Sequence, residues 1–153
     1  MRKVFVIGCS LLGLTIVAGA STQDSAALDK PGTIGVTTRG IGQQFVDRGA
    51  RGRGPGDLLV SRQLVYNRGI TTKAIGHADL VCTFTSSYAR QCNGTYTLPR
   101  GKIVVAGTVT FRQFYELAVI GGTGLYNNVR GSVTVTMLSR RPTREILLFR
   151  LVI

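Results

Sequence analysis

The feature that most limits what this chain can fold into is a series of short β-rich segments between Asp57 and its end. β-branched residues dominate these segments, and no stretch of ten or more residues shows the apolar spacing of a helix. The segments predict strands near residues 58–66, 74–86, 91–98, 102–112, 116–120, 131–138 and 144–151. Many short strands at regular spacing are typical of a β-sandwich or a β-barrel. The chain is therefore predicted to be all-β.

The preceding segment, residues 32–56, is rich in glycine and arginine. Residues 33–38 and 43–47 could each form a short strand, and one N-terminal strand brings the total to about eight. Residues 49–56 alternate Gly with Arg, Ala and Pro, which excludes a regular element. This run is too short for an RNA-binding tail and lacks interleaved aromatic residues, so it predicts a surface loop.

Three glycines in four residues, Gly121, Gly122 and Gly124, follow the apolar run 117–120. A phosphate-binding loop would need a Gly-Lys-Ser/Thr ending and a following helix. Here the alternating residues 133–137 predict a following strand instead. The glycines therefore indicate a tight corner between two strands, where positive φ angles or close backbone approach are required.

The segment 121–126, Gly-Gly-Thr-Gly-Leu-Tyr, with Val129-Arg130-Gly131 after it, resembles the signature of the dirigent and allene oxide cyclase-like barrel family. Two upstream segments are similar to motifs of the same family: Leu-Pro-Arg-Gly and the strand after it at 98–107, and Gly56-Asp57 at a strand start. Val129 stands where the family usually has Ala. The resemblance covers about residues 33–153. It implies a single closed antiparallel β-barrel of about eight strands, with an internal cavity for a ligand.

Residues 1–20 have the pattern of a secretory signal peptide, with Arg2 and Lys3, an apolar run over 4–17 and a small-residue cleavage site at 18–20. The apolar run is short for a transmembrane helix. Residues 21–31 are polar and predict a flexible linker. We therefore expect a secreted, extracellular protein whose barrel domain comprises residues 32–153.

The formal net charge is +12, carried mostly by arginine, and Arg2 and Lys3 leave with the signal peptide. Such a charge attracts anionic polymers without specificity, or serves solubility alone. No specific nucleic-acid partner is predicted. The alternative of a homo-oligomer stays open.

Two cysteines, Cys82 and Cys92, remain after the signal peptide. They lie on strands that flank a turn at 86–90, so a hairpin would place them opposite each other. An even number of cysteines in a secreted chain favours a disulfide. No metal site is predicted, because there is no Cys-x-x-Cys motif and only one histidine.

Few polar residues are candidates for chemistry. His77 and Asp79 share one face of their strand with Val81, Thr83 and Thr85, by period-two alternation. That face either meets solvent, which is the commoner case, or lines a wet cavity. No nucleophile–base triad is evident, because no serine has a convincing partner.

Arg130 could form an ion pair with Asp57 or Glu116 that braces the barrel mouth. Alternatively, the resemblance implies that Arg130, and by extension Asp57, belongs to the ligand cavity, where an arginine and a carboxylate would orient a substrate. The tyrosines 66, 88, 96, 115 and 126 are candidate partners. The candidates for the cavity are Asp57, Tyr66, His77, Glu116, Tyr126 and Arg130.

Two functions are consistent with these observations. In the first, the barrel binds a hydrophobic small molecule and steers its cyclisation or stereoselective coupling by proximity, without a cofactor, as the resemblance implies. In the second, a non-catalytic barrel with a packed interior binds an anionic polymer or cell surface through its basic exterior. Whether the chain is an enzyme is left open. A cavity of a few hundred Å³ with convergent polar groups would favour the first function.

Overall fold

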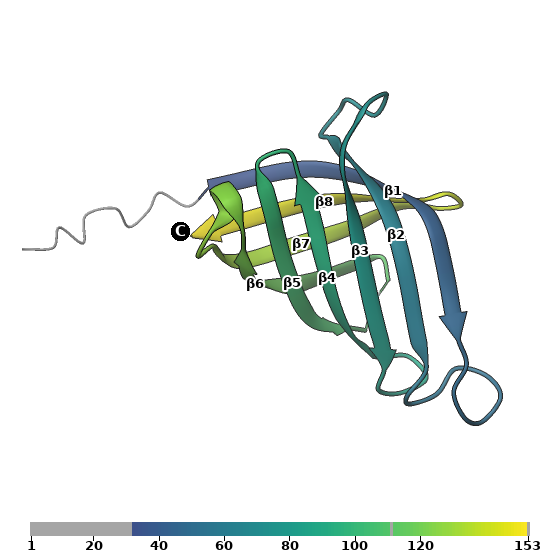
Figure 1. Ribbon diagram of the computed structural model, residues 1–153. Coiled ribbons are helices and arrows are strands. Elements are labelled where there is room, and N and C mark those ends of the chain that lie inside the picture. Colours follow the sequence, from purple (N-terminus) through teal and green to yellow (C-terminus); the bar gives the residue numbers. More distant parts are fainter. Residues whose placement is uncertain (1–31, 111, 153) are drawn as a thin grey trace, which may run out of the picture.

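The computed structural model describes residues 32–110 and 112–152, which form one closed antiparallel barrel (Figure 1). Each strand pairs with the next, and β8 closes the barrel on β1. The predicted signal peptide and linker lie outside the described residues. The elements are β1 (Gly32–Val46), β2 (Leu58–Asn67), β3 (Ala74–Phe84), β4 (Arg90–Leu98), β5 (Gly101–Val109), β6 (Phe114–Gly122), the 3-10 turn η1 (Gly124–Tyr126), β7 (Arg130–Arg140) and β8 (Thr143–Val152). No helical segment among these residues has the length and apolar character needed to cross a bilayer.

The predicted all-β barrel and its seven strands after Asp57 are confirmed, with end shifts of a few residues. The ranges 33–38 and 43–47, which could each have formed a short strand, belong to one continuous strand, β1, which ends at Val46. Its register against β2 shifts between Gly40 and Gly42. A β-bulge there bends the strand without ending it, and glycine tolerates such a bend.

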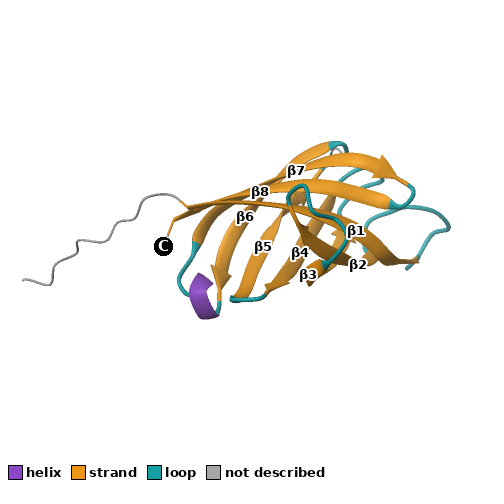
Figure 2. Ribbon diagram, turned by 90° about the horizontal axis from the view of Figure 1, so that it is seen from above, coloured by secondary structure: helices purple, strands orange, loops and turns teal. Residues whose placement is uncertain are grey.

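The two ends of the barrel differ. Figures 1 and 2 show η1 and the C-terminal part of β8 at one end, which we call the η1 end. The opposite end, here the open end, carries the connection 47–57 and the hairpin turns 85–89 and 141–142.

The core fills the barrel towards the η1 end. Tyr96 and Phe149 are fully buried there, with ring centroids 5.2 Å apart in an edge-to-face arrangement. Tyr126 and Val129, which follow β6 in the chain, also belong to the buried core cluster. The interior at this end is therefore packed with side chains.

The glycine motif forms the predicted strand–turn–strand corner, with η1 inserted in the turn. The Leu125 amide donates to the Arg100 carbonyl at 2.9 Å. Gly124 has φ of +64°, and a Cβ there would lie 2.5 Å from that same carbonyl oxygen. The segments at 98–101 and 121–126, which carry the resemblance, therefore pack against each other at the η1 end.

Candidate functional site

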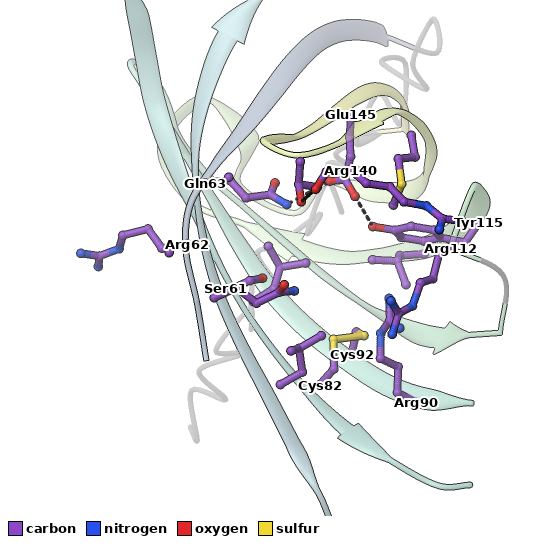
Figure 3. A pocket seen from close by; sticks show the side chains of 18 of the residues that line it. Ser61, Arg62, Gln63, Cys82, Arg90, Cys92, Arg112, Tyr115, Arg140 and Glu145 are labelled. Atoms are coloured by element: carbon purple, nitrogen blue, oxygen red, sulfur yellow. Dashed lines mark hydrogen bonds between the residues drawn. A yellow bond between two sulfur atoms is a disulfide. The ribbon is translucent and has the colours of Figure 1, made fainter. Parts of the chain in front are cut away.

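A cavity of about 510 Å³ occupies the half of the barrel towards the open end (Figure 3). Every strand except β5 contributes to its wall. Four apolar side chains from β2, β3, β6 and β7 line it: Leu59, Leu80, Leu117 and Met137. The cavity thus has apolar side chains on four of its strands, while most of its other lining residues are polar or charged.

The predicted disulfide between Cys82 and Cys92 is present and forms part of this wall. The two residues are direct partners in the β3–β4 ladder, with Cα atoms 4.0 Å apart. Both are buried inside the barrel. The disulfide therefore joins the two strands on the cavity side.

One buried polar cluster of the wall is centred on the carboxyl group of Glu145. Gln63 donates from Nε2 to Glu145 Oε2 at 2.9 Å, and Thr38 Oγ1 donates to the same oxygen at 3.4 Å. The Tyr115 hydroxyl donates to Oε1 at 3.4 Å. Four strands, β1, β2, β6 and β8, bring these side chains together, and Glu145 is only 5% exposed.

Burial raises the pKa values of the two acidic groups in the cluster, Glu145 and Tyr115. It raises the pKa of Glu145, although the hydrogen bonds from Gln63, Tyr115 and Thr38 oppose that rise. Burial, reinforced by nearby Glu145, also raises the pKa of Tyr115. Tyr115 therefore stays a hydrogen-bond donor at neutral pH, and Glu145 holds a proton more tightly than a solvated carboxyl group does.

We expect Glu145→Gln to stabilise the protein at pH 8 but not at pH 4. An unfolded Glu titrates near pH 4.3, and folding raises this pKa. Glu145 thus contributes stability that is complete below about pH 4 and is lost as the pH rises through the folded-state pKa. The loss is roughly 1.4 kcal/mol for each unit of pKa difference, and the variant avoids it. Urea unfolding of both proteins at the two pH values measures this difference. A wild type that is more stable than the variant at pH 8 would contradict the prediction.

Arginines surround the mouth of the cavity. Arg90, Arg112, Arg140 and Arg141 all line it. Figure 3 shows Arg90, Arg112 and Arg140 gathered on the side that also holds Tyr115, whereas Arg62 points away from the cavity. Arg62 forms an ion pair with Asp79 on the outer surface, with 2.7 Å between Nε and Oδ1.

Three of the six predicted cavity residues lie in a loop, on the outer face of a strand or beside a separate small hollow. The Asp57 carboxylate accepts the Arg48 and Gly54 amides, both at 2.7 Å, and so braces the loop 47–57. His77 lies on the outer face of β3 beside Asp79, so that face meets solvent, as the commoner case predicts. Tyr66 borders a separate hollow of only about 10 Å³.

The other three lie on the outer surface or at the η1 end. Glu116 is exposed on β6, where its neighbour Leu117 faces the cavity. Tyr126 is buried in the core, and Arg130 is exposed at the start of β7. Among residues 32–110 and 112–152, Arg130 makes no ion pair, so the bracing contact with Asp57 or Glu116 is not formed. Asp57 lies at the opposite end of the barrel.

The residues that the sequence analysis missed are Gln63, Arg90, Arg112 and Glu145, whereas Tyr115 was named only as a partner. A usable signal existed for Glu145. It precedes Leu147, Phe149 and Leu151 at alternate positions of β8, and all three of these are buried. A carboxylate that lies on the same strand face as buried apolar residues is a stronger site candidate than polar residues on the opposite face of such a strand.

Comparison with known proteins identifies structural relatives only. No family model matches the chain, and no curated protein sequence is similar to it. Among solved structures, a pyocyanin demethylase superposes with a TM-score of 0.68 and 22% identity, over 78% of this chain and 98% of that one. The pterocarpan synthase dirigent protein PsPTS1 gives a TM-score of 0.63 and 15% identity, over 82% and 95% of the two chains.

A third structure, the Diels Alderase AbmU from Streptomyces koyangensis, gives a TM-score of 0.60 and 12% identity. The match covers 82% of this chain and 70% of that one. At these identities the likeness concerns the fold. The chain therefore has the closed eight-stranded barrel fold of the dirigent and cyclase-like proteins, as its glycine motif predicted.

Proposed function

We propose that this chain is a secreted barrel that binds a hydrophobic small molecule at its open end and steers the cyclisation or stereoselective coupling of that molecule. The observation that carries the proposal is the cavity of about 510 Å³, in which apolar side chains from four strands and a buried polar cluster converge. A packed interior would have favoured the non-catalytic alternative. The similarity of fold to a dirigent protein and a Diels Alderase supports the same reading.

The proposed reaction would use the apolar side chains and the polar cluster of the cavity in different ways. Leu59, Leu80 and Leu117 would hold a flexible apolar substrate in a restricted set of conformations, which lowers the entropic part of a cyclisation barrier. By turning from Glu145, the Tyr115 hydroxyl would donate a hydrogen bond to a substrate oxygen on which negative charge develops.

The proposal is tested by filling the cavity from a position that makes no side-chain hydrogen bond in the described structure. Ser61 lines the cavity, and its neighbour Val60 is 40% exposed on the outer face of β2. We expect Ser61→Trp to weaken binding of the neutral fluorophore N-phenyl-1-naphthylamine at least about tenfold, and Val60→Trp to leave it unchanged. The chain has no native tryptophan, so a blue-shifted emission from Ser61→Trp verifies that the new indole is buried. Equal binding by both variants would contradict the proposal.

Secretion is the second part of the proposal, and it rests on the leader pattern at 1–20 and on the disulfide. N-terminal sequencing of protein from the medium of a secreting host should give Ser21 as the first residue. The leader also contains Val6-Ile7-Gly8-Cys9, which superficially resembles a lipoprotein box, so retention of Cys9 with an attached lipid would contradict a soluble secreted product.

The second candidate, a barrel held on an anionic polymer, is favoured by arginines exposed away from the cavity, such as Arg39, Arg144 and Arg150. Retention on heparin–agarose that decreases with salt would support it. This function does not use the cavity, so Ser61→Trp would leave the retention unchanged.

A further inference from the structure

The charges at the mouth of the cavity are unbalanced. Five arginines line the cavity. Arg62 forms an ion pair on the outer surface, which leaves four at the mouth, and Glu145 is the one carboxylate among the lining residues. Glu145 is held by Thr38, Gln63 and Tyr115, none of which carries a positive charge. The cavity of the described structure therefore presents an excess of positive charge.

Nearby carboxylates do not neutralise these arginines. Asp57 accepts the backbone amides of Arg48 and Gly54, and Asp47 accepts the Gly52 amide at 3.0 Å. Asp79 is paired with Arg62 and His77 on the outer surface. Within the described ranges, no ion pair involves an arginine of the mouth.

Arg90 is the most constrained of the four. It is only partly exposed, and its Nε atom is buried without a hydrogen-bond partner in the described structure. Burial lowers the pKa of Arg90, and the neighbouring charge of Arg112 lowers it further. A buried guanidinium N–H without an acceptor costs free energy, as do like charges held close together. An anionic oxygen at the mouth would relieve both costs.

We propose that the cavity takes a hydrophobic organic acid, with its apolar body against the leucines and its anionic group at Arg90 and Arg112. The inference rests on the proposed cavity binding and specifies the substrate class. Arginine suits this role because its planar group donates two parallel hydrogen bonds to a carboxylate or sulfonate. The anion would lie at the mouth, and the rest of the molecule would extend inwards towards Tyr115 and Glu145.

Two fluorophores with one skeleton provide the test: 1-anilinonaphthalene-8-sulfonate and neutral N-phenyl-1-naphthylamine, which lacks the sulfonate. We expect Arg90→Gln and Arg112→Gln each to weaken sulfonate binding about 10- to 100-fold, and to change binding of the neutral probe less than about threefold. Arg112 is exposed, so its variant remains informative if Arg90→Gln folds poorly. Arg150→Gln, which removes the same charge from the outer surface of β8, is the matched control and should change neither constant.

Three results would overturn the inference. An equal loss of sulfonate binding in Arg150→Gln would show adsorption to the basic exterior. A parallel loss of both probes in the Arg90 and Arg112 variants would show a general change in the cavity. Sulfonate binding could also be unchanged in both arginine variants while Ser61→Trp still blocks the neutral probe. That result would show that the cavity does not prefer anions, and the proposed cavity function would still hold. If Ser61→Trp blocks neither probe, the cavity function itself fails.

Discussion

Replacing Gly131 by alanine should lower the free energy of unfolding by about 2 to 6 kcal/mol. Gly131 has φ of +136°, which side chains rarely tolerate, and a Cβ there would overlap the Arg150 carbonyl oxygen on the adjacent strand β8. It would also lie 3.2 Å from Leu151 Cα. Backbone strain and overlap each cost about 1 to 3 kcal/mol, and backbone atoms of a closed barrel have little freedom to move aside.

Gly121→Ala is the matched control for this change. Gly121 is a strand glycine of the same motif, but nothing lies within 4 Å of the position its Cβ would take. We expect it to shift stability by less than about 1 kcal/mol. Urea unfolding followed by circular dichroism compares the two, and similar stabilities would contradict the close packing of β7 on β8.

Removing the disulfide should have the second-largest effect. The double replacement Cys82→Ala/Cys92→Ala releases a loop closed over a sequence separation of 10, which costs roughly 3 kcal/mol on the chain-entropy account. The wall of the cavity should loosen as well, because both cysteines line it. We expect a lower urea midpoint together with weaker binding of N-phenyl-1-naphthylamine.

Reduction of the wild-type protein by dithiothreitol provides the control for the double replacement. It should reproduce most of the loss in stability while leaving both side chains in place. Unchanged stability after complete reduction would show that the disulfide contributes little to stability. Two free thiols found by peptide mapping of the oxidised protein would show that the disulfide does not form.

The fold was predictable because its signals are local. Alternating β-branched residues predict each strand after Asp57, and Gly122, Gly124 and Gly131 mark places where backbone segments meet too closely for any Cβ. These motifs contact one another: Gly101 approaches the Thr123 carbonyl, and Leu125 bonds to Arg100. Two of the three segments that carry the family resemblance therefore specify the η1 end of the barrel, whereas Gly56-Asp57 lies at the open end.

The same fact explains why the site was harder to predict. Tyr126 and Arg130 stand within the motif, so they share its location at the η1 end, whereas the cavity lies at the other end. Glu145 and Gln63 could have been found from their phase with the buried faces of β8 and β2. Arg112 could not, because it lies between β5 and β6 and its position depends on the path of that connection.

The central claim, that the open half of the barrel receives a small apolar molecule, is tested most directly by intermolecular nuclear Overhauser effects. The measurement uses methyl-labelled protein with bound N-phenyl-1-naphthylamine. The account predicts contacts from the probe to the methyl groups of Leu59, Leu80, Leu117 and Met137, which line the cavity from four strands. Contacts to Val60, Val81 and Ile120, which are exposed on the outer face, would contradict it.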